Sequence, residues 1–161
     1  MTKMLPALKT TIAVLTLSVP IAVPVAAHHS LAQFDLTVPV RLKGTVVRFD
    51  RINPHSLIFM DQTKEDGQTQ RWAIDGPTPV ALARRNVGGA FLKAGDVIEV
   101  CGFPMKEGDT STRAFEKMQA RVMSGHVLEM ADGKRWSWND YGQLDRCLNR
   151  GETRTDLAGN G

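Results

Sequence analysis

Three histidines, His28, His29 and His55, are the residues of this sequence that could hold a metal ion. His28 and His29 follow Ala27, where an apolar N-terminal segment gives way to a more polar chain. If the chain is cut after Ala27, His28 carries a free α-amine beside its imidazole ring. The amine and a ring nitrogen can chelate one ion, and a third nitrogen completes a nearly T-shaped site. Copper suits few nitrogen ligands in a plane and is at the top of the divalent affinity order.

In this hypothesis His28 supplies the amine and one ring nitrogen, and His55 or His29 supplies the third nitrogen. The α-amine titrates near pH 8 and imidazole near 6.5, so both can release protons to copper at neutral pH. Two other interpretations stay open. The paired histidines can belong to an inert tail, and His55, which follows the turn residues Asn53 and Pro54, can be an exposed loop residue. His126 lies among apolar strand residues, which is typical of a structural histidine.

Other residues give weaker indications. Asp50 could orient the His55 ring through a hydrogen bond, as carboxylates near metal sites do, although the spacing alone favours a surface carboxylate. Four methionines are candidate soft ligands for reduced copper, but Met more often fills a core. Three aromatic residues near the C-terminus predict either an exposed patch or a lid on the domain. The methionines are Met105, Met118, Met123 and Met130, and the aromatic residues are Trp136, Trp138 and Tyr141.

Residues 1–27 have the pattern of a secretory signal peptide. Lys3 and Lys9 precede an apolar stretch, and small residues at Val25-Ala26-Ala27 favour a cut before His28. A membrane anchor is the rival interpretation, but prolines interrupt the apolar run, which is shorter than the ~20 residues of a usual span. We therefore expect a periplasmic or secreted protein with no stable membrane insertion after cleavage.

Cleavage also changes the charge of the protein. Lys3 and Lys9 are the charged residues of the leader, so their loss lowers the formal net charge of +3 by two. A protein this close to neutral lacks the basic surface that nucleic-acid binding requires. We expect a metal ion as the partner, an envelope protein as a further possibility, and no nucleic acid.

The remaining chain predicts one domain at residues 28–149 and a polar, disordered tail at 150–161. Cys101 and Cys147 would enter an oxidising compartment together, which favours a disulfide between them. Two separate buried cysteines remain the alternative, because the sequence does not give their Cα separation.

Patterns of β-branched and aromatic residues predict a mainly β fold. The first strand contains Gly44, which suggests a bulge or bend, and in the third strand Trp72 and Ile74 share a face. Pro79 precedes a short run of helix-forming residues between the third and fourth strands. Strands are expected at 38–50, 56–62, 69–75, 97–103, 115–122 (continued by 126–130 after a kink) and 134–138, with a short helix at 80–86 and one or two helical turns at 141–149.

Three strands, a short helix and two further strands form the order of an OB-fold barrel. An immunoglobulin-like sandwich would need about seven strands and no helix between the third and fourth. We therefore predict a small OB-like barrel of five to six strands, with one short helix between strands 3 and 4, preceded by a signal peptide.

Four motifs resemble a family of small secreted bacterial proteins defined as a domain of unknown function, number 6152. They are Ala27-His28-His29-Ser30, Gly44-Thr45-Val46-Val47, Asn53-Pro54-His55 and Leu92-Lys93-Ala94-Gly95-Asp96-Val97. The resemblance covers roughly residues 27–105; Cys101, Cys147 and Trp136-Ser137-Trp138 are not part of it. It implies a secreted β-rich domain and no established activity.

Motifs for phosphate loops, nucleophile elbows and CxxC zinc sites are missing from the sequence. The leading hypothesis is an OB-like domain that binds copper, or another transition metal, as a carrier, sensor or buffer. One alternative is a non-catalytic envelope module that binds a peptide, glycan or protein. A second alternative is a copper-dependent oxidative enzyme, which needs a concave substrate surface beside an open metal position.

Processing at the predicted position should give a mature chain that begins at His28. The intact mass of the exported protein measures this directly. With a cut one residue earlier, His29 would be the third residue of the mature chain. Copper would then bind the α-amine, two backbone amides and the His29 ring. A mass that retains the whole leader would contradict both versions of the N-terminal site.

Overall fold

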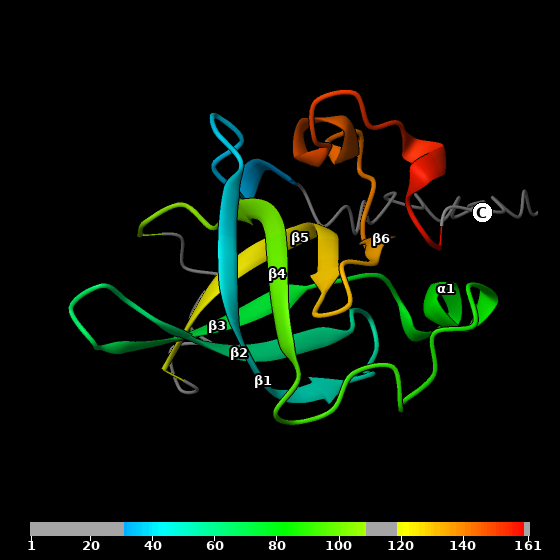
Figure 1. Ribbon diagram of the computed structural model, residues 1–161. Coiled ribbons are helices and arrows are strands. Elements are labelled where there is room, and N and C mark those ends of the chain that lie inside the picture. Colours follow the sequence, from blue (N-terminus) through cyan, green and yellow to red (C-terminus); the bar gives the residue numbers. More distant parts are fainter. Residues whose placement is uncertain (1–30, 109–118, 160–161) are drawn as a thin grey trace, which may run out of the picture.

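The structure is a computed structural model, which describes residues 31–108 and 119–159 (Figure 1). The predictions for the signal peptide at 1–27, for His28, His29 and Met118, and for residues 115–118 of the fifth strand lie outside these ranges. The described elements are η1 (Leu31–Gln33), β1 (Val40–Asp50), β2 (Leu57–Thr63), β3 (Thr69–Asp75), α1 (Pro79–Arg84), β4 (Val97–Pro104), β5 (Ala120–Met130), β6 (Arg135–Ser137), η3 (Leu144–Cys147) and η4 (Arg154–Asp156).

Five strands close into a barrel. The sheet runs β3-β2-β1-β4-β5 through antiparallel pairs, and a parallel pairing of β3 with β5 joins its two ends. β6 is an additional strand on the outer edge of β5, and α1 lies between β3 and β4 in the chain. The prediction of a mainly β, OB-like barrel with one short helix between strands 3 and 4 is confirmed for the described chain.

The core fills the barrel with alternate side chains from its strands, as the period of two requires. Ile58 and Met60 of β2 face Trp72 and Ile74 of β3, and all four are at most 4% exposed. On the opposite face of β2, Phe59 is buried with Ala73 in a separate outer cluster. Burial on both faces explains why β2 is a nearly continuous apolar run.

One end of the barrel is covered by α1 and the segment after β6. The Thr78 hydroxyl caps α1 by accepting a hydrogen bond from the Ala81 amide, and Leu82 of the helix is fully buried. Trp138 is 1% exposed, and its ring lies 5.8 Å from that of Phe49. Trp138 therefore belongs to the lid on the core, whereas Tyr141 is 48% exposed.

Glycines permit two close approaches between strands. The expected bulge at Gly44 is wrong in position, because the register shift of β1 lies between Val46 and Arg48. A Cβ at Gly44 would instead lie 2.6 Å from the Asp61 carbonyl oxygen of β2. At Gly102 of β4 a Cβ would lie 2.0 Å from the Ser124 carbonyl oxygen. Both strands need glycine because a neighbouring backbone occupies the space of a side chain.

The C-terminal segment differs from the prediction. Of the one or two helical turns expected at 141–149, the structure has one, the 3₁₀ turn η3. The tail at 150–161, expected to be disordered, follows a defined path through residue 159, and residues 160–161 lie outside the description. Leu157 is 4% exposed, and the Ala158 amide donates to the Arg135 carbonyl over 2.8 Å. Apolar burial and strand pairing thus offset the ordering cost that its polar composition suggested.

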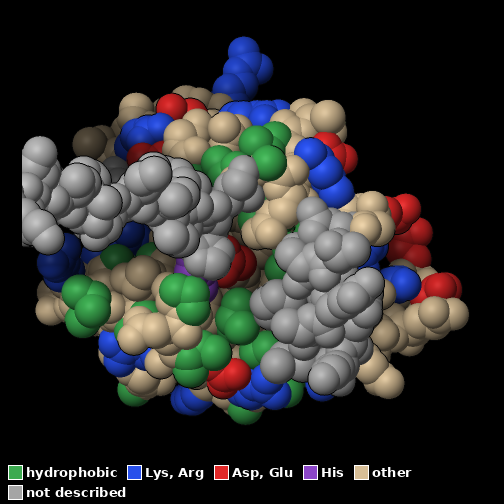
Figure 2. Space-filling view, turned by 180° about the vertical axis from the view of Figure 1, so that it is seen from behind, with side chains coloured by type: hydrophobic (Ala, Val, Ile, Leu, Met, Phe, Trp, Pro, Cys, Tyr) green, Lys and Arg blue, Asp and Glu red, His purple; other side chains and the backbone are tan. Residues whose placement is uncertain are grey.

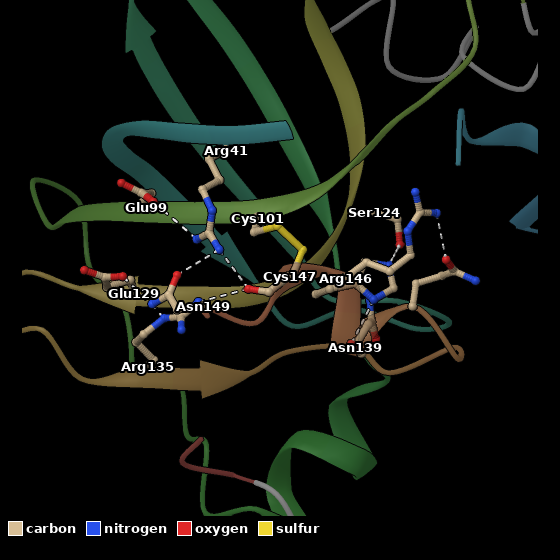
Figure 3. Close-up of a disulfide and its surroundings, with 12 residues drawn as sticks. Arg41, Glu99, Cys101, Ser124, Glu129, Arg135, Asn139, Arg146, Cys147 and Asn149 are labelled. Carbon is tan, nitrogen blue, oxygen red and sulfur yellow. Dashed lines mark hydrogen bonds and ion pairs between the residues drawn. A yellow bond between two sulfur atoms is a disulfide. The ribbon is translucent and has the colours of Figure 1, made fainter. Parts of the chain in front are cut away.

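The predicted disulfide between Cys101 of β4 and Cys147 of η3 is confirmed, with Cα atoms 5.7 Å apart (Figure 3). The Cys147 carbonyl also accepts hydrogen bonds from Arg41 Nη2 at 2.9 Å and Arg135 Nη2 at 3.1 Å. Figure 3 shows these two guanidinium groups converging on this carbonyl beside the disulfide. The C-terminal segment is therefore attached to the barrel both covalently and through hydrogen bonds.

No helix in the described ranges is long and apolar enough to cross a membrane.

Replacing both cysteines with serine should lower the free energy of unfolding by about 4 kcal/mol, because the disulfide closes a loop across a separation of 46 residues. Urea denaturation of the oxidised wild type and the Cys101→Ser/Cys147→Ser protein measures the difference. Dithiothreitol should destabilise the wild type and leave the double variant unchanged. Equal stability of the two proteins would contradict a stabilising role for the bridge.

Candidate functional site

The first described residues lie against the segment that follows β4. The Asp35 amide donates to the Pro104 carbonyl over 2.8 Å, and the Lys106 amide donates to the Gln33 carbonyl over 2.9 Å. Phe34 is 4% exposed and pairs with Met105 in an antiparallel bridge. The chain that leads away from His28 and His29 is therefore fixed to the barrel from η1 onward.

His55 lies in the loop between β1 and β2, close to the end of β3. The Ser56 amide donates to the Pro77 carbonyl, and the Gly76 amide donates to the Ser56 carbonyl, so this loop is held against the segment after β3. His55 Nδ1 lies 2.9 Å and 3.1 Å from the two carboxylate oxygens of Asp75, the last residue of β3. The side chains of this pair are 17% and 16% exposed.

Asp50 is not the carboxylate that contacts His55, and its surface interpretation, which the spacing favoured, agrees with the structure. The Asp50 carboxylate accepts a hydrogen bond from Arg48 Nε at 2.8 Å, on the same strand. Asp75 takes the predicted role because the β2–β3 hairpin places it opposite Leu57, two residues after His55. The register of the β2–β3 hairpin, counted from its turn, pairs Leu57 with Asp75 and could have indicated this carboxylate. The separation of the two residues along the sequence could not.

The carboxylate of Asp75 raises the pKa of His55 above its ordinary value of 6.5, mainly through the hydrogen bond, while partial burial acts in the opposite direction. With a proton on Nδ1 facing the carboxylate, the neutral ring has its lone pair on Nε2. Histidines that bind metals usually have this arrangement, in which a carboxylate orients the ring and increases its basicity. The Asp75–His55 pair thus has the arrangement of a metal-binding histidine and the carboxylate that orients its ring.

A cavity of about 340 Å³ adjoins this pair. It lies where η1, the β1–β2 loop, the end of β3 and the start of the β4–β5 connection meet. Figure 2 shows histidine and acidic colours side by side among hydrophobic side chains on this face. Its volume falls in the range of small-molecule sites, ~300–1,000 Å³. The lining residues are Gln33, Phe34, Ile52, Asn53, Pro54, His55, Leu57, Asp75, Met105 and Val122.

The three candidate methionines in the described ranges do not come together. Met105 lines the cavity, whereas Met123 is fully buried in the barrel core and Met130 packs against that core at the end of β5. Gln33, Phe34, Ile52 and Asp75 were not singled out from the sequence, because only the closed barrel brings them to His55. The described ranges contain no group of three or more His, Cys, Asp or Glu side chains arranged for a metal.

His126 lies in β5, buried and apart from the cavity. Its Nδ1 is 3.0 Å from the Asn139 carbonyl oxygen, and its Nε2 is 3.3 Å from the Ser124 hydroxyl. Burial lowers the pKa of His126 to about 4, so the ring is neutral at physiological pH. These contacts give it a structural role, as the interpretation from its apolar neighbours favoured.

A family model described as a family of unknown function (DUF6152) matches residues 16–115. The match includes the paired histidines, Asp75 and all but one of the cavity-lining residues, the exception being Val122. Cys101 is inside the matched range and Cys147 is outside it. The comparison with curated proteins found no match.

Asp75→Asn should lower the pKa of His55, because it removes the carboxylate that favours the imidazolium. Titration of the ring by NMR measures this value. Asp50→Asn is the matched control and should leave it in place. A His55 pKa at or below 6.5 in the wild type would contradict the pairing.

Proposed function

Because this chain belongs to the DUF6152 family of unknown function, its function must come from its site, and we propose that it is an exported copper-binding domain. Its site joins the amine and ring of His28 to His55, with His29 as the alternative third ligand. The observation that carries the proposal is the Asp75-oriented His55 ring at a cavity that Gln33 also lines. The domain then acts as a copper carrier, sensor or buffer.

The length of the connecting chain supports a shared site. Gln33 lines the cavity, and His28 precedes it by five residues in the sequence. Residues 31–33 form η1, so only the three steps from His28 to Leu31 can extend, and at ~3.3–3.6 Å per residue they span up to about 11 Å. This reach starts at η1, whose last residue, Gln33, lines the same cavity as His55.

The available donors favour copper. Both cysteines of the sequence are joined in the disulfide, so thiolate ligands are missing. The remaining donors are an amine and imidazoles, a set that binds Cu²⁺ more tightly than the other divalent ions of the first transition row. Protons compete for the same nitrogens. Since Asp75 raises the pKa of His55, this competition begins at a higher pH than for an ordinary histidine.

A copper-dependent oxidative enzyme is the second candidate. Such an enzyme needs a concave surface for its substrate beside the metal, and the cavity next to His55 supplies one. The envelope-module alternative has less support from the aromatic group at the C-terminus, because Trp138 is buried and Tyr141 is the exposed ring. Oxygen- or peroxide-dependent turnover of copper-loaded protein distinguishes the enzyme from the carrier.

His55→Ala should weaken Cu²⁺ binding at least tenfold, or ~1.4 kcal/mol, because it removes one of three nitrogens. One glycine added before His28 should do comparable damage by displacing the chelating amine. Competition against a copper chelator, with exported protein that has its native N-terminus, measures both effects.

A pair of matched variants tests the part played by Asp75. Asp75→Asn should weaken copper binding by ~10–100-fold, as expected when the carboxylate that orients a ligand is lost. Asp50→Asn makes the same change at the end of β1, which β2 separates from β3, and should bind copper like the wild type. Unchanged affinity in both His55→Ala and the extended N-terminal variant would refute the proposed site.

A further inference from the structure

The chain bulges away from the barrel between η1 and β1. Val40, the first residue of β1, pairs with Gly102 of β4, and the Asp35 amide donates a hydrogen bond to the Pro104 carbonyl over 2.8 Å. Four residues on the N-terminal side, 36–39, therefore lie opposite a single residue of β4. A regular antiparallel ladder matches one residue with one, so this bulge at 36–39 cannot pair with β4 throughout.

Arg146 of η3 holds the bulge in place. Its Nη1 donates a hydrogen bond to the Leu36 carbonyl, and its Nη2 donates one to the Thr37 carbonyl at 2.7 Å. The same guanidinium lies over the ring of Phe103, the residue of β4 opposite the bulge, 4.9 Å from the centroid. Arginine suits this position because its planar group presents several donors at fixed angles while its face stacks on an aromatic ring. One side chain thus bonds two carbonyls at the place where strand pairing is interrupted.

The backbone that carries Arg146 is itself fixed to the barrel. The next residue, Cys147, is bonded to Cys101 of β4, and its carbonyl accepts hydrogen bonds from Arg41 and Arg135 (Figure 3). The guanidinium therefore reaches the bulge from a restrained backbone. Its two hydrogen bonds then cost mainly the rotamer freedom of one side chain.

The bulge adjoins the part of the chain that borders the candidate site. Gln33 and Phe34 precede the bulge and line the cavity together with His55. Leu36, inside the bulge, packs against the apolar cluster that contains Phe34 and Phe103. The conformation of the bulge therefore affects both a wall of the cavity and the direction in which the preceding residues leave the barrel.

We propose that Arg146 is a positioning residue for the copper site, because by holding the bulge it keeps the N-terminal ligands within reach of His55. This inference rests on the proposed function and adds to it a residue outside the ligand set. Arg146 acts through the backbone of Leu36 and Thr37 rather than through a bond to the metal. Removing its guanidinium leaves every copper ligand in the chain and increases the conformational freedom that the N-terminal segment loses when copper binds.

Arg146→Ala should weaken Cu²⁺ binding of the exported protein at least fivefold, as measured by competition against a copper chelator. Arg150→Ala removes the same charge from an exposed position four residues later and should bind copper like the wild type. Both arginines are exposed, so neither change opens a cavity in the core.

A cycle with His55→Ala separates positioning from a general loss of stability. In the His55→Ala background, Arg146→Ala should have no further effect on copper affinity, because the N-terminal ligands have lost the partner toward which they are positioned. A general loss of stability would weaken binding equally in both backgrounds. Equal losses in the two backgrounds, or an unchanged affinity of Arg146→Ala alone, would overturn the proposal.

Amide hydrogen exchange tests the same role without copper. In EDTA-treated Arg146→Ala, the Asp35 amide, which joins the N-terminal segment to β4, should exchange at least fivefold faster than in the wild type. The Gly76 amide, whose hydrogen bond lies just after β3, should keep its rate, whereas a general loss of stability would accelerate both. An unchanged rate at Asp35 would contradict the proposal.

The two measurements distinguish the failure of this inference from the failure of the copper proposal. If the wild type and Arg146→Ala bind copper equally well, and His55→Ala binds it more weakly, the positioning role alone is refuted. If the wild type does not bind copper, the copper proposal is refuted, and with it the positioning role, whatever the exchange rate at Asp35.

Discussion

The parallel pairing of β3 with β5 is the interaction on which the rest of the structure depends. It turns an antiparallel sheet into a closed barrel, with Asp75 of β3 opposite Ser124 of β5. Closure brings Val122 and the end of β4 to the same end of the barrel as the β1–β2 loop. The cavity and the Asp75–His55 pair exist because these segments, distant along the chain, meet there. In an open sheet Val122 and Asp75 would lie at opposite edges.

The two ends of the described chain hold this site in place together. Arg146, beside the disulfide-bonded Cys147, donates hydrogen bonds to the backbone carbonyls of Leu36 and Thr37. Its guanidinium also lies over the ring of Phe103, 4.9 Å from the centroid. The disulfide therefore fixes a C-terminal arginine that in turn fixes the N-terminal segment. A ligand that binds to the N-terminal segment restricts its conformations less, because the segment is already restrained. The entropy cost of binding is therefore smaller.

His55 and His126 show how environment separates two residues of one type. The carboxylate beside His55 raises its pKa, and burial lowers that of His126 to about 4. His126 therefore costs stability as the pH falls from about 6.5 toward 4, because the unfolded chain binds a proton that the folded chain resists. His55 stabilises the fold fully below pH ~6.5, and this contribution is lost as the pH rises through its raised pKa. Among the described histidines, the carboxylate at the cavity thus favours the charged ring of His55, and burial favours the neutral ring of His126.

The sequence by itself determined the described strands, the helix between β3 and β4 and the disulfide, and it singled out His55, which the structure places at a cavity. These follow from local causes: β-branched runs, a proline at the start of α1, two cysteines that can pair, and a histidine after a turn. Only the tertiary structure decided that Asp75 rather than Asp50 orients His55, that the tail packs through Leu157, and that Phe34 and Ile52 border a cavity. The physical reason is that strand register and barrel closure set which distant side chains meet, and composition carries no measure of either.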